Sequence, residues 1–327
     1  MSDARQEAAA WLDDYFALSG DAGFVPLART RIEIAGADRA SWLHNLCTNE
    51  IKKLAPGHGC EAFFTTVQGK TLGHGFIFAE ADMLVIDTVA GQGETLLKHL
   101  DRYLVCEQVT LTESSGDGFE VVLAGPKSAA IVADVFRTAV PTERLAHSEV
   151  DVDGKAIRIH RVDLGTASFL VEVPRVDGPW LASQLHAAGA RQCSLEALDA
   201  LRIEQGFPLF GRDITDKNLP QELARDELAI SFVKGCYLGQ ETVARIDALG
   251  HVNKLLVGVQ FDGPEIPADG AELQAEGQPV GAVTSATYSP RLERPLALAY
   301  VRHGLAKPEA KLASPVGSAE VVRLPLL

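Results

Sequence analysis

The chain has 327 residues, of which 46% are hydrophobic and 23% charged, and its formal net charge is −14. This length exceeds what one hydrophobic core usually serves, so we expect two or three domains of ordinary globular composition. The acidic balance argues against a wide basic surface for a phosphate backbone, and we expect no direct binding of nucleic acid. It is compatible with a small positive pocket for an anionic ligand.

The cysteines are odd in number and no two form a C-x-x-C pair: Cys47, Cys60, Cys106, Cys193 and Cys236. Neither a zinc ribbon nor a disulfide framework is therefore predicted, and a reducing compartment is the simpler expectation. The first residues lack the apolar core of a signal peptide, and no segment has the roughly 18 apolar residues that span a bilayer. The histidines show no metal-binding spacing. We expect a cytoplasmic protein without a membrane partner or a metal site.

The N-terminal part alternates helical and strand patterns. Residues 5–18 place Trp11, Tyr15 and Leu18 at helical spacing, which predicts an amphipathic helix. Two strand-length runs flank the turn at 68–70, which predicts a hairpin. The remaining predicted elements of this part are a strand at 31–34, a helix at 37–46, the hairpin strands at 63–67 and 75–78, a strand at 83–89 and a helix at 94–103.

A turn cluster at 114–118 (SSGDG) marks the first internal boundary. The section beyond it follows the order strand, helix, strand, strand, helix, which is typical of a small α+β layer. We predict these elements at 119–123, 126–137, 155–161, 168–173 and 179–188.

The last third begins with a strong helical pattern at 194–205, for which Ser194 is predicted as the N-cap. An irregular stretch at 206–233 leads into the segment KGCYLGQE at 234–241. From residue 252 onward, short apolar runs alternate with glycine-containing turns, which predicts a separate small all-β domain.

The segment 234–241 places a lysine and a cysteine two residues apart in a glycine-flanked turn, and Gly239 is predicted to open a helix. Backbone donors at a helix start and a nearby ammonium both favour an anion, either a ligand carboxylate or the Cys236 thiolate. Gln240 and Glu241 suit the edge of a heterocycle. The alternative is a tight turn in which Cys236 is a small buried hydrophobe.

The eight residues together match K-G-C-Y-x-G-Q-E, and the chain resembles the YgfZ-type folate-binding proteins, relatives of the glycine-cleavage T-protein (GcvT). Four further segments resemble motifs of that family, so the resemblance spans most of the chain. These are IAGADRASWLHNLCTN at 34–49, TTVQGK at 65–70, RIEQGFP at 202–208 with PQE at 220–222, and VGAVTSATYSP at 280–290.

The resemblance implies an α+β, GcvT-like fold in which three subdomains form a ring around a central folate cleft, with a small C-terminal β-barrel. It implies a discontinuous N-terminal folate-binding domain (1–115 and 194–250), an α+β middle subdomain (116–193) and the barrel domain (251–327). The implied ligand is tetrahydrofolate or another reduced folate. The functional residues carried over are Lys234, Gly235, Cys236 (as the reactive thiol), Tyr237, Gly239, Gln240 and Glu241, with Asn49 and Gln68 from weaker motifs.

The resemblance also implies an accessory role in assembly or repair of iron–sulfur clusters, with client or assembly proteins as partners. The alternative is a folate-dependent one-carbon transferase resembling the aminomethyltransferases. Those enzymes carry acidic residues in segments corresponding to 69–76 and 164–171, and both segments lack Asp and Glu here. Because a carboxylate is the natural partner of a folate amine, the first interpretation is favoured. Catalytic turnover, the folate form and the client stay open.

Overall fold

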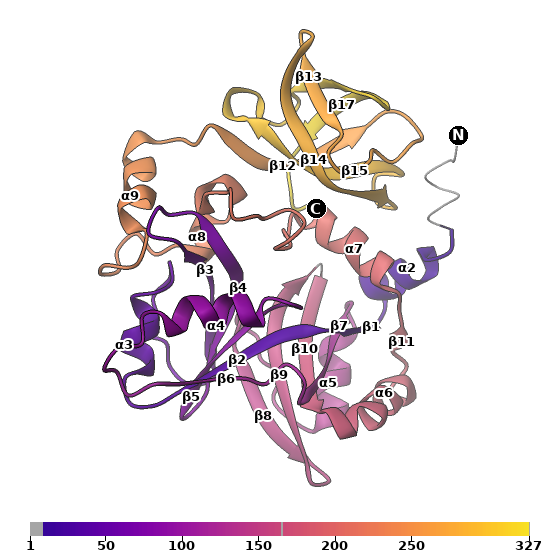
Figure 1. The fold of residues 1–327 in the computed structure, drawn as a ribbon. Coiled ribbons are helices and arrows are strands. Elements are labelled where there is room, and N and C mark those ends of the chain that lie inside the picture. Colours follow the sequence, from indigo (N-terminus) through magenta and orange to yellow (C-terminus); the bar gives the residue numbers. More distant parts are fainter. Residues whose placement is uncertain (1–8, 165, 327) are drawn as a thin grey trace.

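The computed structural model describes residues 9–164 and 166–326. It contains a five-stranded sheet, a six-stranded sheet and a closed β-barrel, with helices around and between them (Figure 1). In Figure 1 the barrel lies at the top and the two sheets lie side by side below it. Within the described residues, no helix is both long and apolar enough to cross a membrane.

The five-stranded sheet is antiparallel and has the order β3-β4-β5-β2-β6. Apolar side chains such as Ile32, Trp42 and Leu96 form its core with the two helices that cover it. The predicted hairpin around 68–70 is confirmed, because β3 pairs with β4 across that turn. The elements are β2 (Arg29–Ala35), α3 (Arg39–His44), β3 (His58–Thr65), β4 (Thr71–Ala79), β5 (Met83–Val89), α4 (Gly93–Asp101) and β6 (Thr110–Glu113).

Helix α3 is shorter than the ten residues predicted at 37–46. Gly36 has a φ of 110°, and the backbone N–H groups of Arg39 and Asn45 bond three residues back, to Gly36 and Trp42. These tighter turns at both ends leave only the central six residues in α-helix.

The six-stranded sheet has the order β11-β1-β7-β10-β9-β8. Its elements are β1 (Gly23–Leu27), β7 (Gly118–Ala124), α5 (Ser128–Phe136), β8 (His147–Val152), β9 (Lys155–Leu164), β10 (Thr166–Pro174), η1 (Arg175–Asp177), α6 (Gly178–Ala187) and β11 (Arg191–Gln192). The middle section thus has the predicted α+β content plus two strands, β8 and β11. Strand β1 comes from the N-terminal part and pairs antiparallel with β7, so this sheet combines segments from both sides of the predicted boundary at 114–118.

Helices α2 (Leu12–Gly20) and α7 (Leu195–Glu204) lie next to each other beside the barrel (Figure 1). Residues 5–8 of the helix predicted at 5–18 lie outside the described residues. Ser194 occupies the N-cap position of α7, but its side chain makes no capping hydrogen bond. Instead, its backbone N–H donates to Oδ2 of Asp14 at 2.9 Å. A carboxylate from α2 therefore satisfies the backbone donor of the N-cap residue itself.

The predicted irregular stretch after α7 contains two short elements, η2 (Pro220–Leu223) and α8 (Asp226–Ala229). Helix α9 (Gln240–Leu249) begins directly after Gly239, as predicted. The C-terminal all-β domain is confirmed as a closed barrel of β12 (Lys254–Phe261), β13 (Glu272–Ala275), β14 (Gln278–Ser289), β15 (Arg294–Arg302), β16 (Lys311–Ser314) and β17 (Gly317–Val322), with η3 (His303–Leu305) after β15. Phe261 and Leu273 are among its fully buried core residues.

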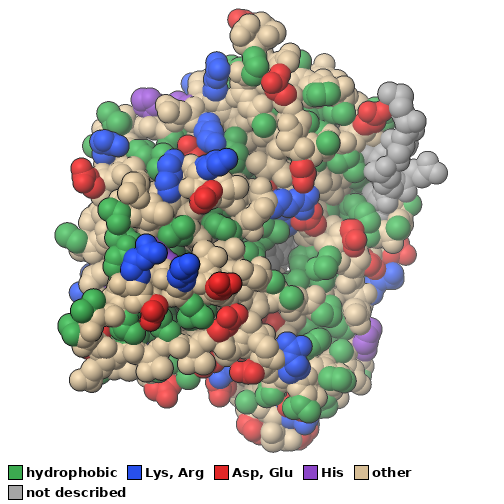
Figure 2. All heavy atoms as spheres, viewed as in Figure 1, with side chains coloured by type: hydrophobic (Ala, Val, Ile, Leu, Met, Phe, Trp, Pro, Cys, Tyr) green, Lys and Arg blue, Asp and Glu red, His purple; other side chains and the backbone are tan. Residues whose placement is uncertain are grey.

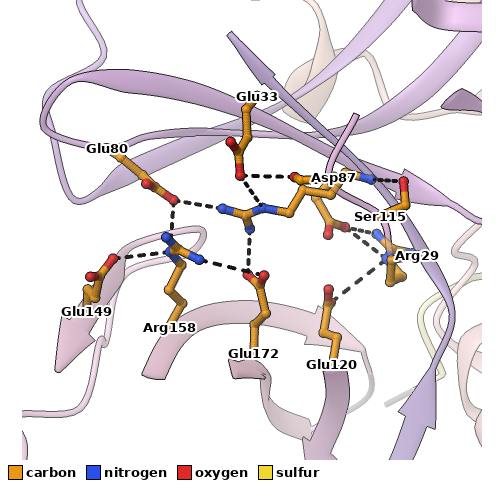
Figure 3. Close-up of polar contacts among 11 residues, drawn as sticks. Arg29, Glu33, Glu80, Asp87, Ser115, Glu120, Glu149, Arg158 and Glu172 are labelled. Carbon is orange, nitrogen blue, oxygen red and sulfur yellow. Dashed lines mark hydrogen bonds and ion pairs between the residues drawn. The ribbon is translucent and has the colours of Figure 1, made fainter. Parts of the chain in front are cut away.

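An ionic network joins the faces of the two sheets (Figure 3). Arg31 of β2 donates to Oε2 of Glu172 on β10 at 2.5 Å, and Arg158 of β9 lies 3.2 Å from Oε1 of Glu80. Carboxylates outnumber guanidinium groups in this network, which comprises Arg29, Arg31 and Arg158 with Glu33, Glu80, Asp87, Glu120, Glu149 and Glu172. The two sheets are thus joined by buried polar contacts as well as by apolar packing.

Candidate functional site

The signature turn, residues 234–241, joins α8 to α9 and shows both buried and exposed side chains. Lys234 and Tyr237 are buried, whereas Gly235, Cys236 and Glu241 are exposed. The two residues before the turn, Phe232 and Val233, are 45% and 95% exposed. The turn therefore presents its thiol on an accessible surface with apolar neighbours.

The ammonium of Lys234 is occupied by the protein itself. Nζ donates to the carbonyl oxygens of His44, of Cys47 at 2.8 Å and of Asn49 at 2.6 Å, and it lies 5.0 Å from the ring centroid of Tyr237. Burial lowers the pKa of Lys234. Because an ammonium has three donor protons, the expected free cation beside the Cys236 thiolate is already committed to residues 44–49.

Two glycines hold the signature turn against the β3–β4 hairpin. Gly239 has a φ of 82°, and a Cβ there would lie 2.6 Å from the carbonyl oxygen of Thr66. A Cβ on Gly69, at the hairpin turn, would lie 2.7 Å from Cβ of Thr242. The hydroxyl of Thr65 also donates to the carbonyl of Leu238 at 2.6 Å. The close backbone approach explains the glycines of both motifs.

The other predicted ligand contacts have partners within the chain or lie exposed. Asn49 donates from Nδ2 to the carbonyls of Glu61 at 2.8 Å and Leu228 at 3.0 Å. Gln240 accepts the backbone N–H of Tyr237 at 3.3 Å, and Gln68 is exposed on the hairpin turn. The structure thus brings the signature turn, residues 44–49 and the hairpin together, and uses many of their polar groups to hold that arrangement.

Only two of the five cysteines, Cys106 and Cys236, are exposed. Cys47 and Cys193 are buried and Cys60 is partly buried, and burial raises the pKa of each of these three thiols, that of Cys193 to about 12. A buried thiol with a raised pKa is a weak nucleophile. Because Cys236 is exposed, the alternative in which it is a buried hydrophobe is wrong.

A cavity of about 560 Å³ lies between the six-stranded sheet, the segment after α7 and the barrel, and Figure 2 shows a hollow between the barrel and the sheets. No residue of the signature turn is among the described residues that line this cavity. Four arginines from three separate parts of the chain line it, with one acid and one aromatic ring: Arg144, Arg161, Arg225, Arg323, Asp163 and Phe207.

Two of these arginines, Arg144 and Arg225, pair with a buried carboxylate that does not line the cavity. Glu61 of β3 accepts hydrogen bonds from Arg144, from Nη2 of Arg225 at 2.7 Å and from Nε2 of His74 at 2.7 Å. Burial alone would raise the pKa of Glu61, but the hydrogen bonds and charge of Arg225, with those of His74, bring it far below its usual range. Burial also lowers the pKa of His74, against the opposing effect of its hydrogen bond to Glu61 and of the Glu61 charge.

A second cavity of about 450 Å³ shares Phe207 with the first. Leu27, Val89 and Leu198 make its walls largely apolar. We refer to the two cavities together as the central cleft. The ring of Phe207 contacts Arg225, whose guanidinium carbon lies 4.8 Å from the ring centroid.

The sequence predicted a central cleft but not the residues that line it. Phe207 lies within the RIEQGFP segment, yet the arginines come from segments about 20 to 100 residues apart, and no spacing connects them. No local signal connects His74 with Glu61, because their contact is made across the β3–β4 pair.

Comparisons with known proteins place this arrangement among proteins of one kind. The family model for the GCVT N-terminal domain matches residues 13–231, and that for the glycine cleavage T-protein C-terminal barrel domain matches residues 254–327. An aminomethyltransferase of Nostoc sp. is 29% identical over 289 residues, covering 85% of this chain and 76% of that protein. A putative chloroplastic transferase of Arabidopsis thaliana is 28% identical over 262 residues, covering 79% and 60%.

The fold also matches a solved structure. The glycine cleavage system aminomethyltransferase T from Bartonella henselae superposes with a TM-score of 0.88 at 20% identity, covering 97% of this chain and 89% of that one. At this identity the likeness establishes the architecture, in which two sheets and a C-terminal barrel surround the cleft.

Proposed function

We propose that this chain, which belongs to the glycine cleavage T-protein family, binds a reduced folate in its central cleft. The observation that carries the proposal is the charge of the larger cavity. Its four arginines face two carboxylates, those of Asp163 and Glu61, which leaves an excess of two positive charges in a protein whose net charge is −14. The glutamate end of a folate carries two carboxylates, which match this excess.

The shape and contacts of the cleft support the same ligand class. Arg323 forms no ion pair with any described residue, so its guanidinium is available to a ligand carboxylate. Phe207 offers an aromatic surface between the two cavities, suited to a pterin or aminobenzoyl ring. The sizes of the two cavities fall in the usual range for small-molecule sites.

Binding without aminomethyl transfer is the better-supported form of this function. A transferase needs a free carboxylate near the folate amine, to place it or accept its proton. The carboxylates nearest the larger cavity are engaged, since Glu61 accepts hydrogen bonds from three side chains and Asp163 pairs with Arg144 and Arg161, each at 3.1 Å. Aminomethyl transfer is still the rival function, because relatives named aminomethyltransferase cover most of the chain.

We assign the chain to the YgfZ type and infer an accessory role in iron–sulfur cluster assembly or repair. The support is the segment KGCYLGQE and the exposure of Cys236, whose thiol meets solvent next to Val233 and Phe232. In this interpretation the central cleft holds the folate, and the signature turn presents its thiol to a client or assembly protein.

Calorimetry tests the folate site. Titration with tetrahydrofolate and 5-formyltetrahydrofolate is expected to give micromolar dissociation constants, or about 8 kcal/mol of binding free energy. Arg323→Gln is expected to weaken binding about tenfold, because it removes one charge-assisted contact. Arg302→Gln, at an exposed position outside the cavity, serves as the matched control. Heats no larger than dilution for every reduced folate would end the proposal.

A second assay separates the two functions. Mixed with an aminomethylated lipoyl carrier protein and tetrahydrofolate, the protein is expected to form no methylenetetrahydrofolate. In cells that lack the endogenous gene, the same protein is expected to restore the activity of iron–sulfur enzymes. Robust methylenetetrahydrofolate formation would establish the transferase instead.

A further inference from the structure

We propose that Glu61 is a positioning residue for the folate site: without touching the ligand, it fixes the direction in which Arg144 and Arg225 face the larger cavity. The inference rests on the proposed folate function. Glu61 itself does not line the cavity, whereas both arginines do.

The contacts of Glu61 reach three separate parts of the chain. Its side chain is fully buried on β3 and accepts hydrogen bonds from His74 on β4, from Arg144 before β8 and from Arg225 before α8. Arg225 uses two nitrogens, Nε and Nη2, on the two oxygens of the carboxylate. This bidentate pairing fixes the plane of the guanidinium as well as its position.

The fixed plane has a further consequence at the cleft. The guanidinium carbon of Arg225 lies 4.8 Å from the ring centroid of Phe207, and the ring centroids of Phe207 and His74 lie 5.7 Å apart. Glu61 therefore holds both the cation and the imidazole that contact the shared ring. Arg144 is held from two sides, by Glu61 and by Asp163 at 3.1 Å.

A positioning role and simple electrostatics predict opposite changes in ligand affinity when Glu61 is replaced. Removing a negative charge beside a site for an anion would strengthen binding if net charge decided the affinity. If preorganisation decides it, two unrestrained guanidinium groups must be ordered when the ligand binds, and the affinity falls.

The test compares Glu61→Gln with wild type by calorimetry, using 5-formyltetrahydrofolate and 6-methyltetrahydropterin, which lacks the glutamate end. We expect about tenfold weaker binding of 5-formyltetrahydrofolate to the variant, with little change for the pterin. Glu143→Gln makes the same exchange at an exposed position next to Arg144 and is expected to bind both ligands like wild type. Arg225→Lys keeps the charge but not the bidentate pairing, and it should also weaken folate binding, which keeps the test available if Glu61→Gln does not fold.

The outcomes separate the two proposals. Wild-type protein that binds no reduced folate refutes the folate function itself. If wild type binds, equal or tighter binding by folded Glu61→Gln refutes the positioning role, as does unchanged affinity in Arg225→Lys. An equal loss for folate and pterin would mean that Glu61 supports the whole cleft and not the arginines in particular, and that outcome also overturns the inference.

Discussion

The two glycines of the signature turn, Gly235 and Gly239, are expected to differ in how much stability the protein loses when each is replaced by alanine. Gly239 has a φ of 82°, a conformation that costs alanine about 1–2 kcal/mol. A Cβ there would lie 2.6 Å from the carbonyl oxygen of Thr66 and 2.8 Å from Oγ1 of Thr65, and overpacking of this kind costs about 1–3 kcal/mol. Gly239→Ala should therefore lower the free energy of unfolding by about 2–5 kcal/mol.

Gly235 is the matched control within the same turn. A Cβ at this position meets nothing closer than Nε2 of His44 at 3.9 Å, and its φ is not positive. Gly235→Ala should change the free energy of unfolding by no more than about 0.5 kcal/mol. Urea unfolding measures both variants, and hydrogen exchange at the amides of Leu238 and Gln240 reports on the turn itself. Equal stability of the two variants, or wild-type exchange in Gly239→Ala, would refute the steric argument.

Three further predictions concern charge, burial and the thiol. Burial raises the pKa of Glu120 well above its ordinary value, with the adjacent Asp87 charge acting in the same direction. Because the folded state then holds a proton that the unfolded state releases, stability from this group is present below about pH 4.5 and is lost as pH rises toward the folded pKa. Glu120→Gln should remove this decline of the urea midpoint above about pH 4.5, and an unchanged pH profile would contradict it. Lys234→Met should lower the free energy of unfolding in urea by about 3–5 kcal/mol, because three backbone carbonyls lose a buried donor. A decrease of less than about 1 kcal/mol would contradict this and would mean that water replaces the ammonium. Cys236→Ser should abolish rescue of iron–sulfur enzymes while leaving folate affinity and stability near wild type, with a Ser substitution at the other exposed cysteine, Cys106, as control. Full rescue by Cys236→Ser would show that the thiol is not needed for this function.

Much of the fold was predictable because its signals are local. The apolar run at 83–89 coincides with β5, and the hairpin turn at 68–70 lies between β3 and β4. Gly239 precedes α9 as predicted, because a left-handed glycine suits the position before that helix. The short strands after residue 252 close into a barrel. Each of these predictions depends on spacing within a few residues.

The predictions that were wrong or incomplete depend on partners far away in the sequence. Ser194 has the residue type and place of an N-cap, yet Asp14, 180 residues earlier, bonds the backbone there. Strand β1 contains Pro26 and is short, so nothing local marks it, and it forms only because β7 and β11 flank it.

The candidate site shows the same difference between local features and contacts of distant segments. By itself the sequence determined the family resemblance, the signature turn and its glycines, because these are properties of contiguous residues. Only the tertiary structure decided that Lys234 serves residues 44–49, and that Arg144 and Arg225 meet at Glu61. A buried charge takes whichever partners the packing of distant segments brings within hydrogen-bonding distance, and one sequence does not encode that choice in its spacing.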